Sequence, residues 1–145
     1  MFPSIAAERA PLAGPRPLRD MTLFGSALDA MPEAPVDREA LLELVDRDTV
    51  FLERLIKTFR DDCEDYLQDI RVAIRRGDAE TLTDEAHGLK GAAAHMQAEP
   101  ARAAARRLEE LGRAGELEQA PDTFRRLETA VDRLIPALEE MVENA

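Results

Sequence analysis

"DTVFLERLIKTFRDDCEDYLQDIRVAIRRGD", residues 48–78, is the stretch that decides the fold class. Its apolar side chains recur in steps of three and four, which is the spacing of one face of an α-helix. They stand at positions 52, 55, 56, 59, 63, 66, 67, 70 and 74. Two cations, Arg75 and Arg76, precede Gly77, a combination typical of a helix C-terminus. The stretch therefore predicts one long helix with one buried face.

The neighbouring stretches repeat the helical pattern. Asp37 is a suitable N-cap for a short helix before residue 48, and Asp78 for a third helix that runs to about Gln97. The apolar stripe of the short helix contains Ala40, Leu41 and Leu44. The apolar seam of the third helix contains Leu82, Ala86, Leu89, Ala93 and Met96.

Two further helices are marked by prolines near their starts. Pro100 suits the first turn of a helix that ends near Gly112–Gly115, and Pro121 opens the last helix. The first of these carries Ala103, Ala104, Arg107, Leu108 and Leu111. The last carries Phe124, Leu127, Val131, Leu134, Leu138 and Met141. Pro136 lies inside the last helix and is expected to kink or divide it. The short connections predict an all-α fold, an up-down antiparallel four-helix bundle with an additional short N-terminal helix.

The first 35 residues differ from the rest in composition. They hold six of the nine prolines and sustain no apolar period, so we interpret residues 1–35 as a disordered or loosely docked arm. The stretch 21–31 within the arm is compatible with a short helix that packs on the domain. Residues 36–145 are expected to form the helical bundle.

The net charge bears on the kind of partner, and the cysteine content bears on the cellular location. The formal net charge is −11, which disfavours nucleic acid and anionic membrane surfaces as partners. No apolar run approaches the roughly 20 residues that span a bilayer. Cys63 is the single cysteine and is expected to be at least half-buried, and no intrachain disulfide can form. We therefore expect a cytoplasmic protein.

The third helix carries a histidine on the face opposite its apolar seam. His87 lies about 140° from the centre of that seam on a helical wheel, so it faces solvent or a partner. Lys90 and Gly91 are one turn on, beside it. Gly88 and Gly91 each cost about 1 kcal/mol relative to Ala inside a helix. An exposed imidazole beside an ammonium and a bare backbone suits a nucleophile that holds an anionic group such as phosphoryl.

The run "AHGLKGAAAHMQAEPARAAARRLEEL", residues 86–111, resembles the signature of histidine-containing phosphotransfer (HPt) domains. His87, Leu89, Lys90 and Gly91 match the signature, with Leu108–Glu109 downstream, and the resemblance covers roughly residues 37–143. The family commonly has Gly ten residues after the histidine, where this chain has Gln97. The departure is expected to affect the turn between two helices and not the nucleophile.

The resemblance implies a phosphoryl carrier rather than an enzyme. His87 would take a phosphoryl group from the aspartyl phosphate of a receiver domain, through Nε2, and pass it to a second receiver. Lys90 would neutralise phosphoryl charge and Gly91 would let the receiver approach closely. The chain would need no cofactor or metal of its own, since the receiver would bring Mg²⁺ and the catalytic acids.

The same resemblance implies the partners. They would be response-regulator receiver domains and a histidine kinase or hybrid kinase, met by a monomer. The receiver would dock on the exposed faces of the second and third helices around His87. On the third helix this surface is expected to include Thr83, Asp84, Gly88 and Ala94.

Two other functions compete with this one. A dinuclear metal-carboxylate bundle needs two acid-x-x-His motifs pointing inward, and only Asp84 and His87 offer one, with His95 badly placed as a second ligand. A helical interaction module that binds a signalling partner without phosphotransfer is the other alternative. Loss of His87 would abolish phosphotransfer but largely spare simple binding.

Overall fold

The computed structural model describes residues 34–144, and within that range every regular element is a helix. They are α2 (Arg38–Leu44), α3 (Thr49–Arg76), α4 (Ala79–His95), α5 (Glu99–Ala114), the 3₁₀ helix η1 (Leu117–Gln119) and α6 (Ala120–Glu143). The all-α prediction is confirmed for this part of the chain. Residues 1–33, and with them the stretch 21–31, lie outside the described residues.

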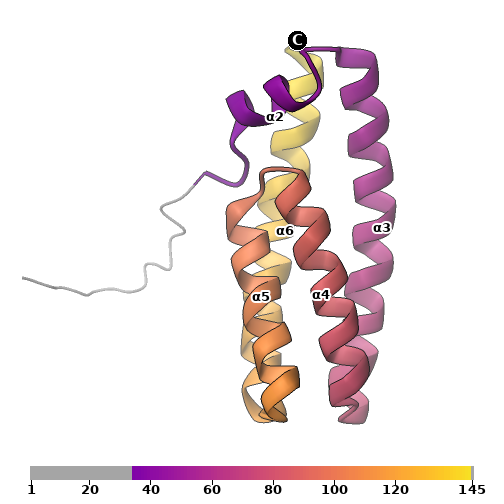
Figure 1. Ribbon diagram of the computed structural model, residues 1–145, viewed down its shortest axis with the longest axis vertical. Helices are drawn as coiled ribbons and strands as arrows, with labels where there is room; N and C mark the ends of the chain where they lie inside the picture. Colours follow the sequence, from indigo (N-terminus) through magenta and orange to yellow (C-terminus); the bar gives the residue numbers. More distant parts are fainter. Residues whose placement is uncertain (1–33, 145) are drawn as a thin grey trace, which may run out of the picture. The chain divides into compact units, whose positions relative to one another are not determined.

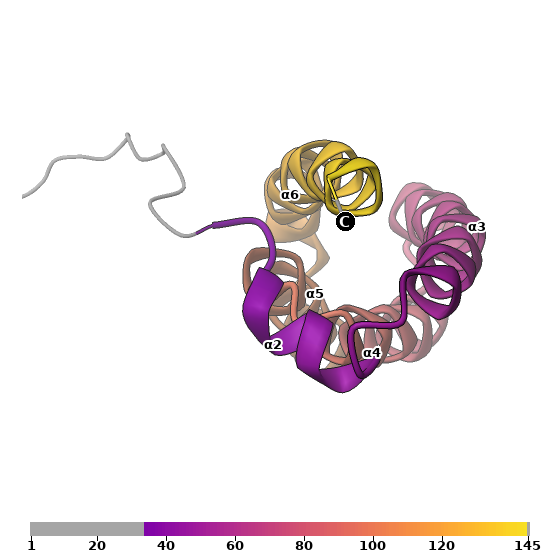
Figure 2. The ribbon, with the colours of Figure 1, turned by 90° about the horizontal axis from the view of Figure 1, so that it is seen from above.

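The four long helices lie side by side, and successive helices run in opposite directions (Figure 1). Figure 2 shows α3, α4, α5 and α6 in sequence order around a common interior, with α2 across one end. Each long helix packs on the helix that follows it, and α3 also packs on α6. Each therefore buries one face, and α4 has α3 on one flank and α5 on the other.

The helices begin and end at capping residues, which include the predicted Asp37, Asp78 and Gly77 and also Asp48. The side chains of Asp37, Asp48 and Asp78 accept hydrogen bonds from backbone N–H groups three residues on, each at 3.1 Å. Gly77 and Gly115 end α3 and α5 in the left-handed conformation, with φ of 69° and 71°.

The interior contains the α4 seam as predicted, since all five of its residues are buried. The six apolar residues predicted for α6 are buried as well, and so is Cys63. Pro136 does not divide α6, which continues as one helix to Glu143. Within residues 34–144 no helix is long and apolar enough to cross a membrane.

The predicted stripes of α2 and α5 were partly wrong. Leu44 is 46% exposed and Val45 is buried instead, because the chain leaves α2 there through Asp46 and Arg47 in the left-handed conformation. In α5, Ala103 and Arg107 are exposed and Ala104 is half-buried, whereas the buried stripe contains Ala101, Ala105, Leu108, Leu111 and Gly112. A run rich in alanine gives little information about which face is buried, because alanine is tolerated on either side.

The α4–α5 turn contains Gln97 at the position where the family commonly has Gly. Gln97 takes a left-handed φ of 59°, which costs a non-glycine residue roughly 1–2 kcal/mol. Its carbonyl accepts a hydrogen bond of 2.9 Å from the Asp37 N–H. The turn thus keeps the conformation that glycine adopts freely, and it is tied to the start of α2.

Candidate functional site

His87 stands on the outer face of α4, opposite the buried seam. Its side chain is 64% exposed, as its helical position predicts. One turn on, Gly91 is exposed, and a Cβ built there would meet nothing within 4 Å. The imidazole is therefore open to a large partner on the side of Gly91.

A buried carboxylate from α5 holds the other side of the imidazole. Glu109 is only 1% exposed, and its Oε2 lies 2.8 Å from His87 Nδ1. Its Oε1 lies 2.7 Å from Lys90 Nζ, and Arg113 reaches Oε2, also at 2.7 Å. Both carboxylate oxygens are thus occupied, and the charge of a buried Glu is matched by two cations.

The charges around Glu109 decide which imidazole nitrogen is free. The hydrogen bond from Lys90 lowers the pKa of Glu109, and His87 and Arg113 lower it further against the opposing effect of burial. Glu109 is therefore ionised near neutral pH and can only accept hydrogen bonds. Nδ1 of His87 must then be the donor, so a neutral imidazole carries its lone pair on the exposed Nε2.

The opposite flank of α4, toward α3, differs from the α5 flank in its charges and in its packing. A Cβ built on Gly88 would lie 2.6 Å from Cε1 and 2.8 Å from Oη of Tyr66, so the tyrosine ring lies directly against the α4 backbone. Burial raises the pKa of Glu85, and Asp69 on α3 raises it further by its charge and by a hydrogen bond. This flank presents acids and an aromatic ring where the α5 flank presents cations.

Comparisons with known proteins agree with this geometry. The sequence profile of the Hpt domain matches residues 54–137. The chain belongs to the Hpt domain family. The crystal structure of histidine-containing phosphotransfer protein B (HptB) from Pseudomonas aeruginosa PAO1 superposes with a TM-score of 0.68 at 27% identity, covering 80% of this chain and 99% of that one. No curated protein sequence matches significantly. Family membership supports a phosphotransfer role in two-component signalling.

The remaining predicted residues of this Hpt chain are distributed over both flanks of His87. Asp84 and Ala94 are exposed on the outer face of α4. Thr83 is half-buried, its hydroxyl donates to the Ala79 carbonyl at 2.8 Å, and it lies against Gly112 of α5. Gly88 is half-buried under Tyr66. The structure thus places Thr83 and Gly88 at contacts between helices, beside the open face.

Glu109 is the site residue whose role the sequence reasoning missed. It appeared only as the second residue of the Leu108–Glu109 pair, with no role attached. The available signal was its position, since Glu109 is four residues after Ala105 and three before Gly112, both on the buried stripe. A charged residue in a buried stripe needs a partner. The sequence analysis places the stripe of α5 on Ala103, Ala104 and Arg107 instead of Ala101 and Ala105. It therefore does not show that Glu109 lies on the buried face.

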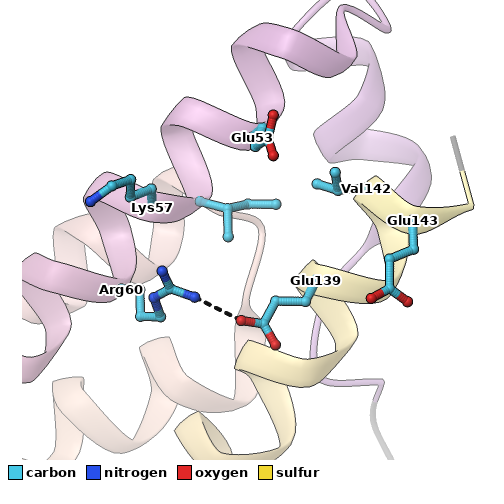
Figure 3. Close-up of a pocket in the computed structure, with 7 residues that line it drawn as sticks. Glu53, Lys57, Arg60, Glu139, Val142 and Glu143 are labelled. Atoms are coloured by element: carbon cyan, nitrogen blue, oxygen red, sulfur yellow. Dashed lines mark hydrogen bonds and ion pairs between the residues drawn. The ribbon is translucent and has the colours of Figure 1, made fainter.

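The open cleft in Figure 3 lies away from this site. It has a volume of about 470 Å³ between α3 and α6, and the Arg60–Glu139 ion pair of 2.7 Å crosses it. None of His87, Lys90 and Glu109 lines it. Among residues 34–144, no group of three acidic, His or Cys side chains is placed to hold a metal ion. The cleft and the outer face of α4 around His87 are therefore separate parts of the molecule.

Proposed function

We propose that this protein is a phosphorelay intermediate. His87 accepts a phosphoryl group from the aspartyl phosphate of one receiver domain and passes it to another receiver domain. The observation that carries the proposal is the exposed imidazole whose Nδ1 lies 2.8 Å from the buried Glu109 carboxylate. An idle surface histidine has no need of a buried acid that orients it.

The transfer step follows from the tautomer that Glu109 selects. The Nε2 lone pair attacks phosphorus, the N–P bond forms, and the P–O bond to the receiver aspartate breaks with its electron pair leaving on the carboxylate. The proton on Nδ1 stays in place, and the ring becomes cationic. Glu109 faces that new positive charge at hydrogen-bond distance, as the acid of a catalytic triad faces its histidine. Passing the group onward is the reverse of this step.

Two cations that bond Glu109, Lys90 and Arg113, lie near the imidazole and suit the negative charge of a phosphoryl group. A phosphoryl group brings about two negative charges. Lys90 is 29% exposed, so its ammonium bonds Glu109 and still has protons directed to solvent. In the proposed complex Lys90 neutralises part of the phosphoryl charge. No cofactor is required in this chain, and Mg²⁺ and the catalytic acids are supplied by the receiver.

The receiver docks on the outer face of α4, with Gly91 at the point of closest approach. Asp84 and Ala94 border that point, and Thr83 and Gly88 support it from the helix contacts. The scaffold is an up-down antiparallel four-helix bundle of α3 to α6 with α2 as an additional short helix. The protein acts in the cytoplasm as a monomer, with receiver domains and a histidine kinase or hybrid kinase as partners and with no nucleic acid or membrane bound.

The test is phosphoryl transfer from a phosphorylated receiver domain to the wild type and to His87→Gln, with His95→Gln as the matched control. The expected product is labile in acid and stable in base, as a phosphoramidate is, and forms on the wild type and His95→Gln only. Labelling of His87→Gln would contradict the proposal. Absence of label on the wild type with a panel of receivers, while receivers still bind, would favour the interaction module.

A further inference from the structure

We propose that Tyr66 of α3 is a further receiver-contacting residue, which fixes the position of the docked receiver on the α3 side of His87. The inference rests on the proposed function, because it assigns a role in receiver docking. The contact between the Tyr66 ring and Gly88 is absent from the sequence-based description of the site.

The first observation is that Gly88 is needed for the place of the tyrosine ring. The Cβ of any other residue at 88 would come within 2.9 Å of three atoms at the outer end of the ring, Cε1, Cζ and Oη. Heavy atoms do not approach so closely, so the ring lies where a side chain at 88 would be. Gly91, three residues on, has no such neighbour. The space beside Gly88 is thus occupied by a side chain of this protein, whereas the space beside Gly91 is open.

The second observation is where this places the phenol. Residue 88 follows His87 on α4 and is turned by about 100° from it, toward α3, so the hydroxyl end of Tyr66 lies on the α3 side of the face that carries the nucleophile. Tyr66 is half-buried, and within residues 34–144 its hydroxyl has no hydrogen-bond partner. A phenol of this kind normally finds a partner when it is covered. The docked receiver is the body that covers it.

The chemistry of tyrosine suits a contact of this type. Its ring is large and rigid, so it contributes contact area at small loss of side-chain entropy, and its hydroxyl adds one directional hydrogen bond. Asp62 and Asp69, one turn before and after it on α3, are exposed. The receiver group that meets the Tyr66 hydroxyl is therefore a polar or basic group and not a carboxylate.

The experiment compares two phosphoryl donors on Tyr66→Phe. A phosphorylated receiver domain needs docking, whereas phosphoramidate, a small inorganic donor, reaches His87 without it. Removal of one intermolecular hydrogen bond is expected to lower the ratio of receiver transfer to phosphoramidate labelling by about two- to tenfold. Phe51→Ala is the control on the same helix, because Phe51 is 50% exposed near the start of α3, far from His87. It is expected to leave the ratio at the wild-type value.

A double-mutant cycle tests the role of Gly88. Gly88→Ala displaces the Tyr66 ring and is expected to lower the same ratio by a similar factor. In a Tyr66→Ala background, where no ring is left to displace, Gly88→Ala is expected to have no further effect. Circular dichroism of each variant checks that the helices are retained.

The outcomes are distinct. A lower ratio for Tyr66→Phe, with non-additive Gly88→Ala, supports the proposal. An unchanged ratio overturns it, and so does an equal loss with both donors, because that would place Tyr66 in the fold or in the reactivity of His87. Labelling of wild-type His87 by phosphoramidate but by no receiver would instead refute the proposed function itself.

Discussion

A carboxylate lies on each flank of α4, and the surroundings shift the pKa values of these two groups in opposite directions. On the α5 flank, Glu109 is buried and bonded by Lys90, His87 and Arg113, which lower its pKa. On the α3 flank, burial and the nearby Asp69 raise the pKa of Glu85. The first flank fixes the imidazole and supplies positive charge. The second flank offers contact surface and like charges, since the charged neighbours that shift the pKa of Glu85 are Asp69 and Asp84.

The comparison indicates that the two flanks of His87 have different roles. Under the proposed function, the α5 flank governs the reactivity of the imidazole, and the α3 flank governs how a receiver docks beside it. Variants on the first flank are therefore expected to change transfer from every donor. Variants on the second flank are expected to change docking or stability.

The largest effect is expected at Glu109. Glu109→Gln keeps the shape of the side chain but removes its charge, so the imidazole loses its fixed tautomer and the counter-charge of its phosphorylated form. By analogy with acids that orient a functional histidine, we expect phosphotransfer to slow by about 10- to 100-fold. The measurement is the second-order rate constant of transfer from a phosphorylated receiver. Glu110→Gln, at the exposed neighbouring position, is the matched control and should transfer like the wild type.

A smaller effect is expected at Lys90. Lys90→Met keeps the aliphatic chain and removes the ammonium, which leaves Arg113 as the cation bonded to Glu109. We expect transfer to fall by about tenfold or less, the scale of one charge-assisted contact. The control is Lys57→Met, since Lys57 is 70% exposed on α3 and forms an exposed ion pair with Asp61 at 3.4 Å. A Lys90→Met protein that transfers at the wild-type rate would remove Lys90 from the site.

The lowered pKa of Glu109 also predicts a pH dependence of stability. The folded protein binds the Glu109 proton less readily than the unfolded chain, so this carboxylate stabilises the fold above its ordinary pKa of about 4.3. That contribution is lost as the pH falls through the lowered folded value. Urea unfolding between about pH 5 and pH 3 should therefore show a larger loss for the wild type than for Glu109→Gln. Parallel losses in the two proteins would contradict the ion-pair network.

The smallest effect, with the opposite sign, is expected at Glu85. Its raised pKa means that the ionised form is disfavoured in the fold, so the charge of Glu85 destabilises the protein at neutral pH. Glu85→Gln is expected to increase the free energy of unfolding by about 0.5 kcal/mol at pH 7, as for other like-charge pairs. The gain should shrink as the pH falls and Glu85 becomes protonated. A loss of stability at pH 7 would show that Glu85 makes a favourable contact instead.

The sequence predicted the helices and the nucleophile for identifiable physical reasons. Asp37 and Asp78 combine with apolar steps of three and four to mark helix starts, and these local rules do not depend on neighbouring helices. The exposure of His87 followed from its angle to the α4 seam. These features are encoded within single helices.

The parts that the sequence could not predict depend on how helices meet. The alanines of α5 fit either face, so the contact of Glu109 with His87 and Lys90 appears only once α5 is packed on α4. The sequence analysis places Gly88 on the receiver-docking face, and only the packing of α3 shows that the Tyr66 ring lies against it. Gln97 replaces the glycine common at its position, yet the turn remains left-handed.

The most direct test of the account is the tautomer and phosphorylation site of the His87 imidazole. Two-bond ¹H–¹⁵N NMR of the two histidines, assigned with His95→Gln, reports which nitrogen carries the proton, and ¹⁵N–³¹P coupling reports which one bonds phosphorus. We predict Nδ1–H in the free protein and the phosphoryl group on Nε2, with the Nδ1–H preference weakened in Glu109→Gln. An Nε2–H tautomer, or a phosphoryl group on Nδ1, would contradict the role assigned to Glu109.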